Sequence, residues 1–167
     1  MYATELKAKL ESMGYTVVLT HDDQTFPQAF NANQNNLFSA DERAAYVNTL
    51  DVDLLVSLHC DIFEGDDSVK GSRVYYYDTE IKQNASSDGV AESIGNWIAK
   101  EFPEMRNPPI HNNTSYVILR KTTMAAVLVE IGFISNQSDA ENIQDPAWME
   151  KFIHGVAQGI HNYYFVE

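Results

Sequence analysis

Apolar residues recur at helical spacing in three parts of the chain, and this spacing predicts amphipathic helices. The three stretches are residues 3–13, 86–101 and 146–160. Gly14 follows the first as a typical helix stop, and Asp145 with Pro146 forms a typical start for the last. The sequence SADE at residues 39–42 is a capping box, so a further helix is predicted from there to about Asn48.

Other apolar residues lie in short runs that predict strands. The runs are YTVVLT (15–20), VDLLVSL (52–58), SRVYYYD (72–78), SYVILR (115–120) and AVLVEI (126–131). The run at 72–78 alternates more than the others, which favours a position nearer the edge of a sheet. Residues 22–38 are rich in Asp, Asn and Gln and predict a loop.

The order of these elements predicts the fold class. Unbroken apolar strands that alternate with helices are typical of an α/β fold, here a three-layer, mostly parallel twisted sheet with helices on both faces. The chain has 167 residues, which suits one domain with a core of its own. We therefore expect a single domain over residues 1–167.

Two polar residues mark one rim of the predicted sheet. His59 directly follows the strand at 52–58, and Glu130 lies at the end of the strand at 126–131. If these strands are parallel, both side chains emerge beyond the carboxyl ends of the strands, where sheets of this kind bind their ligands. The sequence therefore predicts that His59 and Glu130 converge on one site.

Glu130 is the most informative candidate, because it places a carboxylate inside an apolar strand and a buried carboxylate without a partner is costly. It either pairs with an arginine or caps a loop, or it is a general acid/base whose pKa is raised by apolar neighbours. His59 taken alone is more often a core histidine than a metal ligand. Asp61 could orient His59 or cap the loop that follows.

Composition narrows the class of protein. The formal net charge of -13 argues against a nucleic-acid partner, because surfaces that bind nucleic acid are usually basic. Cys60 is the one cysteine, so no disulfide can form within the chain, and we expect it to pack pointing away from His59. No apolar run reaches the ~20 residues of a membrane span. The first residues lack the apolar segment of a secretory signal, so an exported form would need a leader.

Several motifs occur together in a fixed order. They are VVLTHDD (17–23), RAAYVN (43–48), SLHCD (57–61) and the block from Ser115 to Ile143, which contains VLVEIGFISN. On these motifs the chain resembles the zinc-dependent N-acetylmuramoyl-L-alanine amidases, the amidase_3 catalytic domain, over nearly its whole length. The last block is the most specific. His21 stands where the family usually has an arginine, and Asp61 replaces an asparagine.

The resemblance implies a function for the two rim residues. His59 would be a zinc ligand and Glu130 the catalytic carboxylate. The implied reaction is hydrolysis of the amide between N-acetylmuramic acid and the L-alanine of the peptidoglycan stem peptide. In the family, zinc lowers the pKa of its water and polarises the carbonyl, and Glu130 would take the proton and return it to the leaving amine.

The chain departs from the family at its start. The family's first strand ends in a Gly-His-Gly-Gly-like turn that supplies a ligating histidine, and a ligating glutamate follows; neither has a counterpart here. A catalytic zinc takes three protein ligands, so two of the three implied ligands are missing. Glu5 lies too close to Gly14 to be that glutamate and is expected on the solvated surface of the first helix.

The other histidines are weaker candidates. His21 and His111 could each substitute for a missing ligand, or could be ordinary loop residues. His154 and His161 lie on the last predicted helix and are expected at the surface. The GFISN block (132–136), like the tyrosines at 75–77, could contact substrate or could serve only a turn and strand packing.

Two functions therefore stay open. The first is a peptidoglycan hydrolase of the zinc amidase type, acting at the cell envelope or outside the cell. The alternative is a non-catalytic module that binds peptidoglycan or a partner. A generic metallopeptidase is less favoured, because no His-Glu-x-x-His helix is present. Truncation, a segment supplied from elsewhere and loss of activity would each explain the missing start, and the oligomeric state is not predicted.

Overall fold

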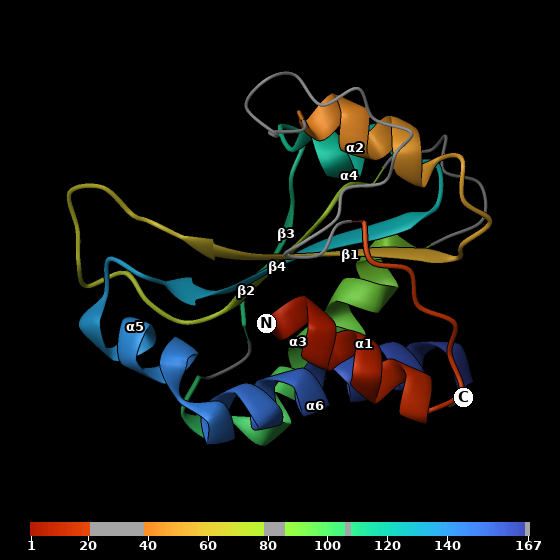
Figure 1. Ribbon diagram of the computed structural model, residues 1–167. Helices are drawn as coiled ribbons and strands as arrows, with labels where there is room; N and C mark the ends of the chain where they lie inside the picture. Colours follow the sequence, from red (N-terminus) through yellow and green to blue (C-terminus); the bar gives the residue numbers. More distant parts are fainter. Residues whose placement is uncertain (21–38, 79–85, 106–107, 166–167) are drawn as a thin grey trace.

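The structure, a computed structural model, describes residues 1–20, 39–78, 86–105 and 108–165 (Figure 1). The helices are α1 (Tyr2–Ser12), α2 (Ala40–Val47), α3 (Ser87–Glu101), the short 3-10 helix η1 (Pro103–Met105), α4 (Val117–Lys121), α5 (Gln137–Gln144) and α6 (Pro146–Phe165). The strands are β1 (Leu54–Asp61), β2 (Arg73–Tyr76), β3 (Ile110–Asn112) and β4 (Ala125–Phe133). The order of helices and strands confirms the predicted α/β class.

The four strands form one sheet in the order β1-β4-β2-β3. β1 pairs with β4, and β2 with β3, in parallel; β2 and β4 run antiparallel. The sheet is therefore mostly parallel, as predicted. β4 is buried along its whole length, because it lies between two strands and has helices over both faces.

Helices cover both faces of the sheet (Figure 1). On one face, α1, α3 and α6 pack on the sheet and form the larger core with strand residues such as Val74, Val127 and Val129. On the other face, α2 and α4 pack with Ala126 and Leu128 in a smaller core. The candidate site lies on this second face, towards the carboxyl end of β4.

The predicted helix boundaries are confirmed by their caps. Ser39 and Glu42 form a complete capping box at the start of α2. The Oδ1 of Asp145 accepts hydrogen bonds from the first backbone amides of α6, at 2.7 and 2.9 Å. Gly14 follows α1 with a φ of 94°, a left-handed conformation that favours glycine. Within the described residues, no helix is both long and apolar enough to cross a membrane.

The prediction of a strand at residues 15–20 is wrong. This segment is extended and its side chains alternate between half-buried and exposed positions up to Leu19, yet it joins no strand ladder among the described residues. A run of β-branched residues fits a strand only where a neighbouring strand pairs with it. Tyr15 and Val17 instead pack against the larger core as single side chains.

The prediction of a strand at residues 115–120 is also wrong, because Val117–Lys121 forms α4. The Oδ1 of Asn113 accepts hydrogen bonds from the backbone amides of Ser115 and Tyr116, and this turn starts the helix. A short apolar run does not by itself distinguish a buried helical turn from a strand.

The prediction that residues 72–78 lie nearer the edge of the sheet is wrong, because a further short strand pairs with them. β2 lies inside the sheet, between β4 and β3. The edge strand beyond it is β3, which has three residues and no apolar run, so the sequence pattern gave no sign of it.

The corner between β4 and α5 depends on one buried carboxylate. Asp139 is 6% exposed, and its Oδ2 accepts hydrogen bonds from the backbone amides of Gly71 (2.8 Å) and Phe133 (2.9 Å). It therefore ties the β1–β2 loop to the end of β4. Gly132 leaves the space for this contact, since a Cβ there would lie 2.9 Å from the same oxygen.

We expect the substitution Asp139→Ala to lower the free energy of unfolding by about 2 kcal/mol, because it leaves two buried amides without an acceptor. Asp139→Asn is the matched control, since one amide oxygen can still accept both bonds, and its effect should be clearly smaller. Urea denaturation of the three proteins measures this. Equal stability of the alanine and asparagine variants would contradict the role given to this oxygen.

Candidate active site

Three side chains line up across the sheet at the carboxyl end of β1 and β4. In the register of the sheet, His59 of β1 is the partner of Glu130, and Arg73 of β2 is the partner of Glu130 on its other side. Residues paired in this way point to the same face of a sheet. His59, Glu130 and Arg73 therefore share the face that α2 and α4 cover, as the sequence predicted for the first two.

A bulge in β4 brings one more side chain to this face. His59 pairs with Glu130 but Asp61 pairs with Phe133, so three steps along β4 match two along β1. An extra residue in one strand inverts the alternation of the side chains that follow it. The ring of Phe133 accordingly lies under the guanidinium of Arg73, 4.6 Å from its central carbon.

Glu130 is a buried carboxylate without a partner. It is 4% exposed, and its Oε2 accepts no hydrogen bond from any described residue. Burial raises the pKa of Glu130 to about 7; the negative charge of Asp61 adds to the rise, and Arg73 opposes it. A carboxyl group with a pKa near 7 can both take up and release a proton at neutral pH.

His59 is a half-buried imidazole held by a neighbour on its own strand. Its Nε2 lies 2.8 Å from the Oγ of Ser57, two residues earlier on the same face. Burial holds the pKa of His59 below its ordinary value, and the positive charge of Arg43 lowers it further, while Asp61 opposes both. His59 is therefore neutral at neutral pH, the state in which an imidazole can coordinate a metal.

The two open readings of Asp61 can be separated. Its Oδ1 accepts a hydrogen bond from the backbone amide of Ile62 at 2.8 Å, so it caps the loop after β1. Ser57, and not Asp61, orients His59. Cys60, between His59 and Asp61 in β1, is exposed, so the prediction that it serves packing is wrong.

Aromatic side chains border the site on the β2 side. Tyr75 of β2 stacks on His111 of β3, with ring centroids 5.5 Å apart, and meets the ring of Tyr116 edge-on at 5.2 Å. Burial raises the pKa of Tyr116, and Tyr75 and Glu130 add to the rise. Tyr75 thus belongs to an aromatic cluster beside Glu130. This position is compatible with both roles predicted for the tyrosines at 75–77, substrate contact and strand packing.

The described residues do not fit a catalytic zinc by themselves. A catalytic zinc takes three protein ligands, and among the described parts of the chain no three His, Cys, Asp or Glu side chains are grouped to hold a metal. His59 and Asp61 are the possible donors beside Glu130. The roles of His59 as a zinc ligand and of Glu130 as the catalytic carboxylate stay predictions.

Among the other candidates that the structure describes, His111 borders the site through its stack with Tyr75, and the rest lie on α1 and α6. His21 falls outside the described residues. His111 is exposed on β3. His154 lies 2.9 Å from a carboxylate oxygen of Glu101, and the Nδ1 of His161 lies 3.1 Å from the hydroxyl of Tyr15, so both are partnered and only half-exposed on α6. Glu5 is exposed on α1, as predicted.

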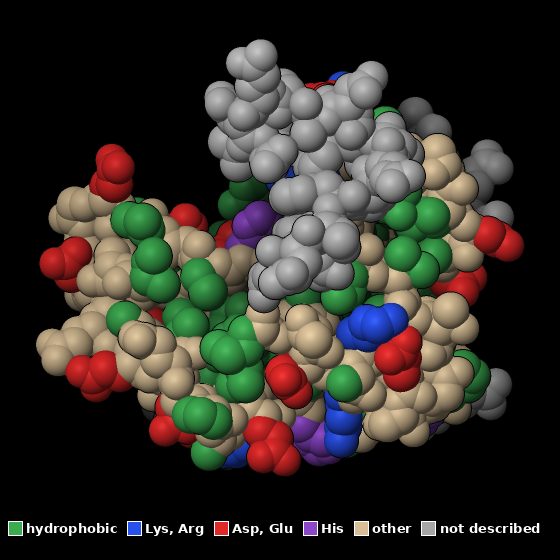
Figure 2. All heavy atoms as spheres, viewed as in Figure 1, with side chains coloured by type: hydrophobic (Ala, Val, Ile, Leu, Met, Phe, Trp, Pro, Cys, Tyr) green, Lys and Arg blue, Asp and Glu red, His purple; other side chains and the backbone are tan. Residues whose placement is uncertain are grey.

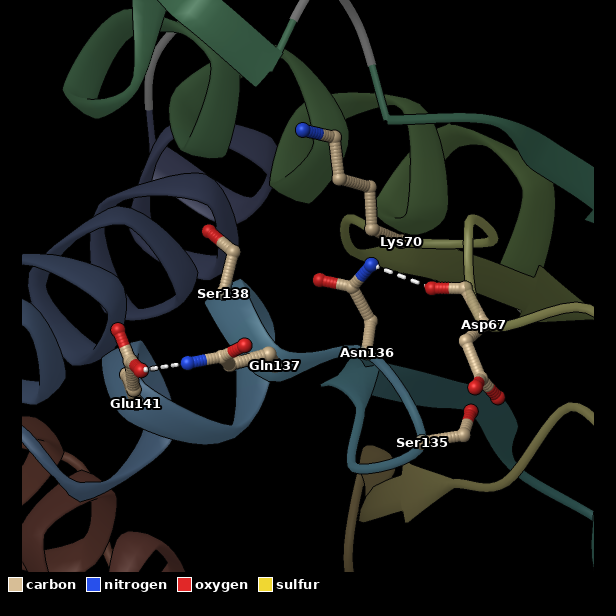
Figure 3. Close-up of a pocket in the computed structure, with 7 residues that line it drawn as sticks. All are labelled: Asp67, Lys70, Ser135, Asn136, Gln137, Ser138 and Glu141. Carbon is tan, nitrogen blue, oxygen red and sulfur yellow. Dashed lines mark hydrogen bonds between the residues drawn. The ribbon is translucent and has the colours of Figure 1, made fainter.

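A polar hollow of about 490 Å³ lies at the start of α5 (Figure 3). Lys70 faces the first residues of α5 across it, with Asp67 and Glu141 on opposite sides. Asn136 caps α5 and donates a hydrogen bond to the carbonyl of Asp67. The hollow contains neither His59 nor Glu130, and Asn136 at its edge acts as the cap of α5.

Exposed apolar side chains border the site beyond the strand ends. Ile62 and Phe63 follow β1, Ile134 follows β4, and each is at least 42% exposed. The ring of Phe63 meets Phe133 edge-on. This contact connects the exposed apolar side chains to the face that carries Glu130 and Arg73. Figure 2 shows hydrophobic side chains gathered on the side of the molecule formed by the β1–β2 loop and α5.

The chain that carries this face matches a known protein family. The family model described as Amidase_3, N-acetylmuramoyl-L-alanine amidase, matches residues 1–162. The chain belongs to this amidase family. The match includes β1 and β4, and with them both His59 and Glu130, so the resemblance found in the motifs is confirmed.

Named relatives of this chain include two bacterial proteins. N-acetylmuramoyl-L-alanine amidase LytC of Bacillus subtilis is 29% identical over 162 residues, which is 97% of the chain and 29% of LytC. The probable cell wall amidase LytH of Staphylococcus aureus is 28% identical over 162 residues, 97% of the chain and 47% of LytH. The chain therefore spans less than half the length of either relative.

Solved amidase structures share the fold. The CwlD amidase from Clostridioides difficile, in complex with the GerS lipoprotein, superposes with a TM-score of 0.82 at 21% identity and covers 99% of this chain and 84% of its own. The catalytic domain of CwlV from Bacillus (Paenibacillus) polymyxa gives 0.79 at 24% identity, over 99% and 82%. These likenesses confirm the predicted α/β architecture.

Sequence reasoning missed the neighbours of the two central residues. Ser57 lies two positions before His59 in the same strand, so strand alternation would have placed both on one face. Arg73 begins a strand, and only the pairing of β2 with β4 places it beside Glu130. Arg43 reaches the site from α2; it begins the motif RAAYVN, but the motif did not indicate a place beside His59.

Proposed function

We propose that this chain is the catalytic part of a peptidoglycan hydrolase that cleaves the amide between N-acetylmuramic acid and the L-alanine of the stem peptide. The observation that carries the proposal is Glu130, a buried carboxylate whose Oε2 has no hydrogen-bond partner among the described residues, beside His59 on one face of an amidase-family sheet. Relatives named as an N-acetylmuramoyl-L-alanine amidase and as a probable cell wall amidase support this substrate. The cell wall is accordingly the proposed site of action.

Glu130 is proposed as the general acid and base. With a pKa of about 7, its carboxylate form accepts a proton from water as the water oxygen attacks the amide carbon. When the carbon–nitrogen bond breaks, the same carboxyl group returns the proton to the nitrogen of L-alanine. The products are a free lactyl carboxylate and a free amine. No covalent intermediate forms, so no serine or cysteine nucleophile is needed.

His59 is the zinc ligand that we propose from the resemblance to the family. Bound zinc lowers the pKa of water and polarises a carbonyl. Ser57 holds the imidazole in place through Nε2, which leaves Nδ1 as the nitrogen available to a metal. Because the described residues group no three donors, further ligands would have to lie outside them, and we assign no step of the reaction to the metal.

A binding module is the second candidate, favoured by the same shortage of grouped donors. Such a module would hold peptidoglycan on this face without cutting it. The unpartnered Glu130 argues for catalysis, since a carboxylate kept only for the fold would be expected to have a partner.

Digestion of purified peptidoglycan tests the proposed function. The wild-type protein, supplied with zinc, should release peptides with a free N-terminal L-alanine without producing new reducing sugar ends. Mass spectrometry of bound metal, compared between the wild type and His59→Ala, tests the ligand. Binding to cell walls without release of N-terminal L-alanine would favour the binding module.

A further inference from the structure

Arg73 is a half-buried cation with an unusual set of contacts. It is the register partner of Glu130, and its guanidinium lies over the ring of Phe133 at 4.6 Å. The ion pairs formed between described residues are Lys7–Glu11, Lys121–Asp41 and His154–Glu101, and none of them includes Arg73. Its charge is therefore not neutralised by a described carboxylate, although Glu130 lies on the adjacent strand.

Two buried polar atoms near Arg73 lack hydrogen-bond partners among the described residues, so a polar group of a ligand could bind there. Within the described part of the chain, the buried side-chain atoms without a hydrogen-bond partner are the Nε of Arg43 and the Oε2 of Glu130, and both belong to this site. Buried polar atoms in folded proteins nearly always have partners. A guanidinium stacked on a ring keeps its N–H edge free, in the geometry that binds a carboxylate.

The two arginines of the site stand out against the negative charge of the whole chain. A chain with a net charge of -13 repels anionic ligands from most of its surface. Arg43 and Arg73 place two positive charges on opposite sides of Glu130, one beside β1 and one on β2. The site face thus offers a local attraction for a substrate anion, and Arg73 offers it on the side away from His59.

The stem peptide carries an anion at the matching distance. Its second residue is D-glutamate linked through the side-chain carboxyl, which leaves the α-carboxylate free or amidated. In an extended stem this carboxylate lies about 6–7 Å from the nitrogen of L-alanine. The side chains of Glu130 and Arg73 start about 5 Å apart as neighbours on adjacent strands, so an arginine can reach it while Glu130 meets the amide.

We propose that Arg73 binds the free α-carboxylate of the second stem residue, so that the site selects stems in which this carboxylate is not amidated. This inference rests on the proposed function for the identity of the substrate. A hydrogen-bonded pair between charged groups in a half-buried site favours the acid over its amide by about 10- to 100-fold.

Two substrates that differ in one group test the proposal: N-acetylmuramoyl-L-alanyl-D-glutamate and its D-isoglutamine counterpart. The wild type should prefer the acid in kcat/KM by about 10- to 100-fold. In Arg73→Gln the ratio should fall close to one, and Arg73→Lys, which keeps the charge without the planar fork, should lie between. Arg120→Gln, an exposed arginine on α4, is the matched control and should keep the wild-type ratio.

Binding separates this inference from the proposed function. Titration of the isotope-labelled protein with free L-alanyl-D-glutamate and with L-alanyl-D-isoglutamine, followed by NMR, needs no hydrolysis. Selective binding of the acid that Arg73→Gln abolishes supports the inference even if the wild type cleaves nothing. Cleavage or binding of both ligands with equal efficiency overturns the inference and leaves the amidase function standing. A preference that survives in a folded Arg73→Gln protein also overturns it, as does binding of neither dipeptide.

Discussion

Replacing Glu130 by glutamine is expected to make the folded protein more stable and less active at the same time. At pH 8 the variant should unfold with a free energy about 3 kcal/mol higher than that of the wild type. Its amide hydrolysis should fall by about 10²- to 10⁴-fold, the usual contribution of a general acid/base. Such opposite effects are the mark of a site that is strained for function.

The sign of the stability effect follows from the pKa of Glu130. Burial raises it from 4.5 to about 7, so the folded state favours the protonated form. Below about pH 4.5 both states are protonated and the group has little effect. Between pH 4.5 and 7 the unfolded chain loses its proton first, and the wild type loses stability as the pH rises. Glutamine carries no charge, so the variant escapes this loss.

Urea denaturation at pH 4 and pH 8, in buffer without metal, measures the effect. The two proteins should have similar stabilities at pH 4 and diverge towards pH 8. Glu92→Gln, which removes an exposed carboxylate on α3, should show no such divergence. If Glu130→Gln is less stable than the wild type at pH 8, Glu130 has a partner in solution and the argument for its role fails.

Introducing a single methyl group at Gly159 is expected to destabilise the fold by about 2–3 kcal/mol. A Cβ at this position would lie 2.5 Å from the Cα of Ile94 and 2.9 Å from its amide nitrogen. Both are backbone atoms of α3, so they cannot move aside as a flexible side chain can. The clash should outweigh the gain of about 1 kcal/mol that alanine brings to a helix interior.

Gly155→Ala is the matched comparison, one helical turn earlier on the same face of α6. Its Cβ would meet the backbone of Ile98 at 3.3 Å, a distance that a small shift relieves, so its effect should stay within about 1 kcal/mol. Thermal or chemical denaturation of the two variants gives the difference. Equal effects would mean that the spacing of α3 and α6 is not set at Gly159.

The fold was largely predictable, because the signals that define it are local. Capping residues such as Ser39 and Asp145 fixed helix starts, and the apolar run in β4 marked the central strand. The failures at 15–20 and 115–120 have one cause: short apolar runs adopt the structure that their neighbours allow. No local pattern says whether a pairing strand is present.

Two residues of the site, Glu130 and His59, were predictable because each is a polar residue that interrupts or ends an apolar run. Glu130 was recognisable because a carboxylate interrupts an apolar strand, and His59 because it ends one. Arg43 and Arg73 break no such pattern, since arginine is ordinary in a helix and at the start of a strand. Their relevance comes from the pairing of β2 with β4 and the packing of α2, which are tertiary facts.

The additional residue in β4 has a consequence for variation in length. Removing one position between Glu130 and Phe133 would restore regular pairing with β1 and leave the phenylalanine opposite Asp61. The ring would then stay on the face of Glu130, under the guanidinium of Arg73. Loss of a residue at this corner should therefore be tolerated better than loss of one from the regular part of β4, which would shift the register and turn side chains to the opposite face.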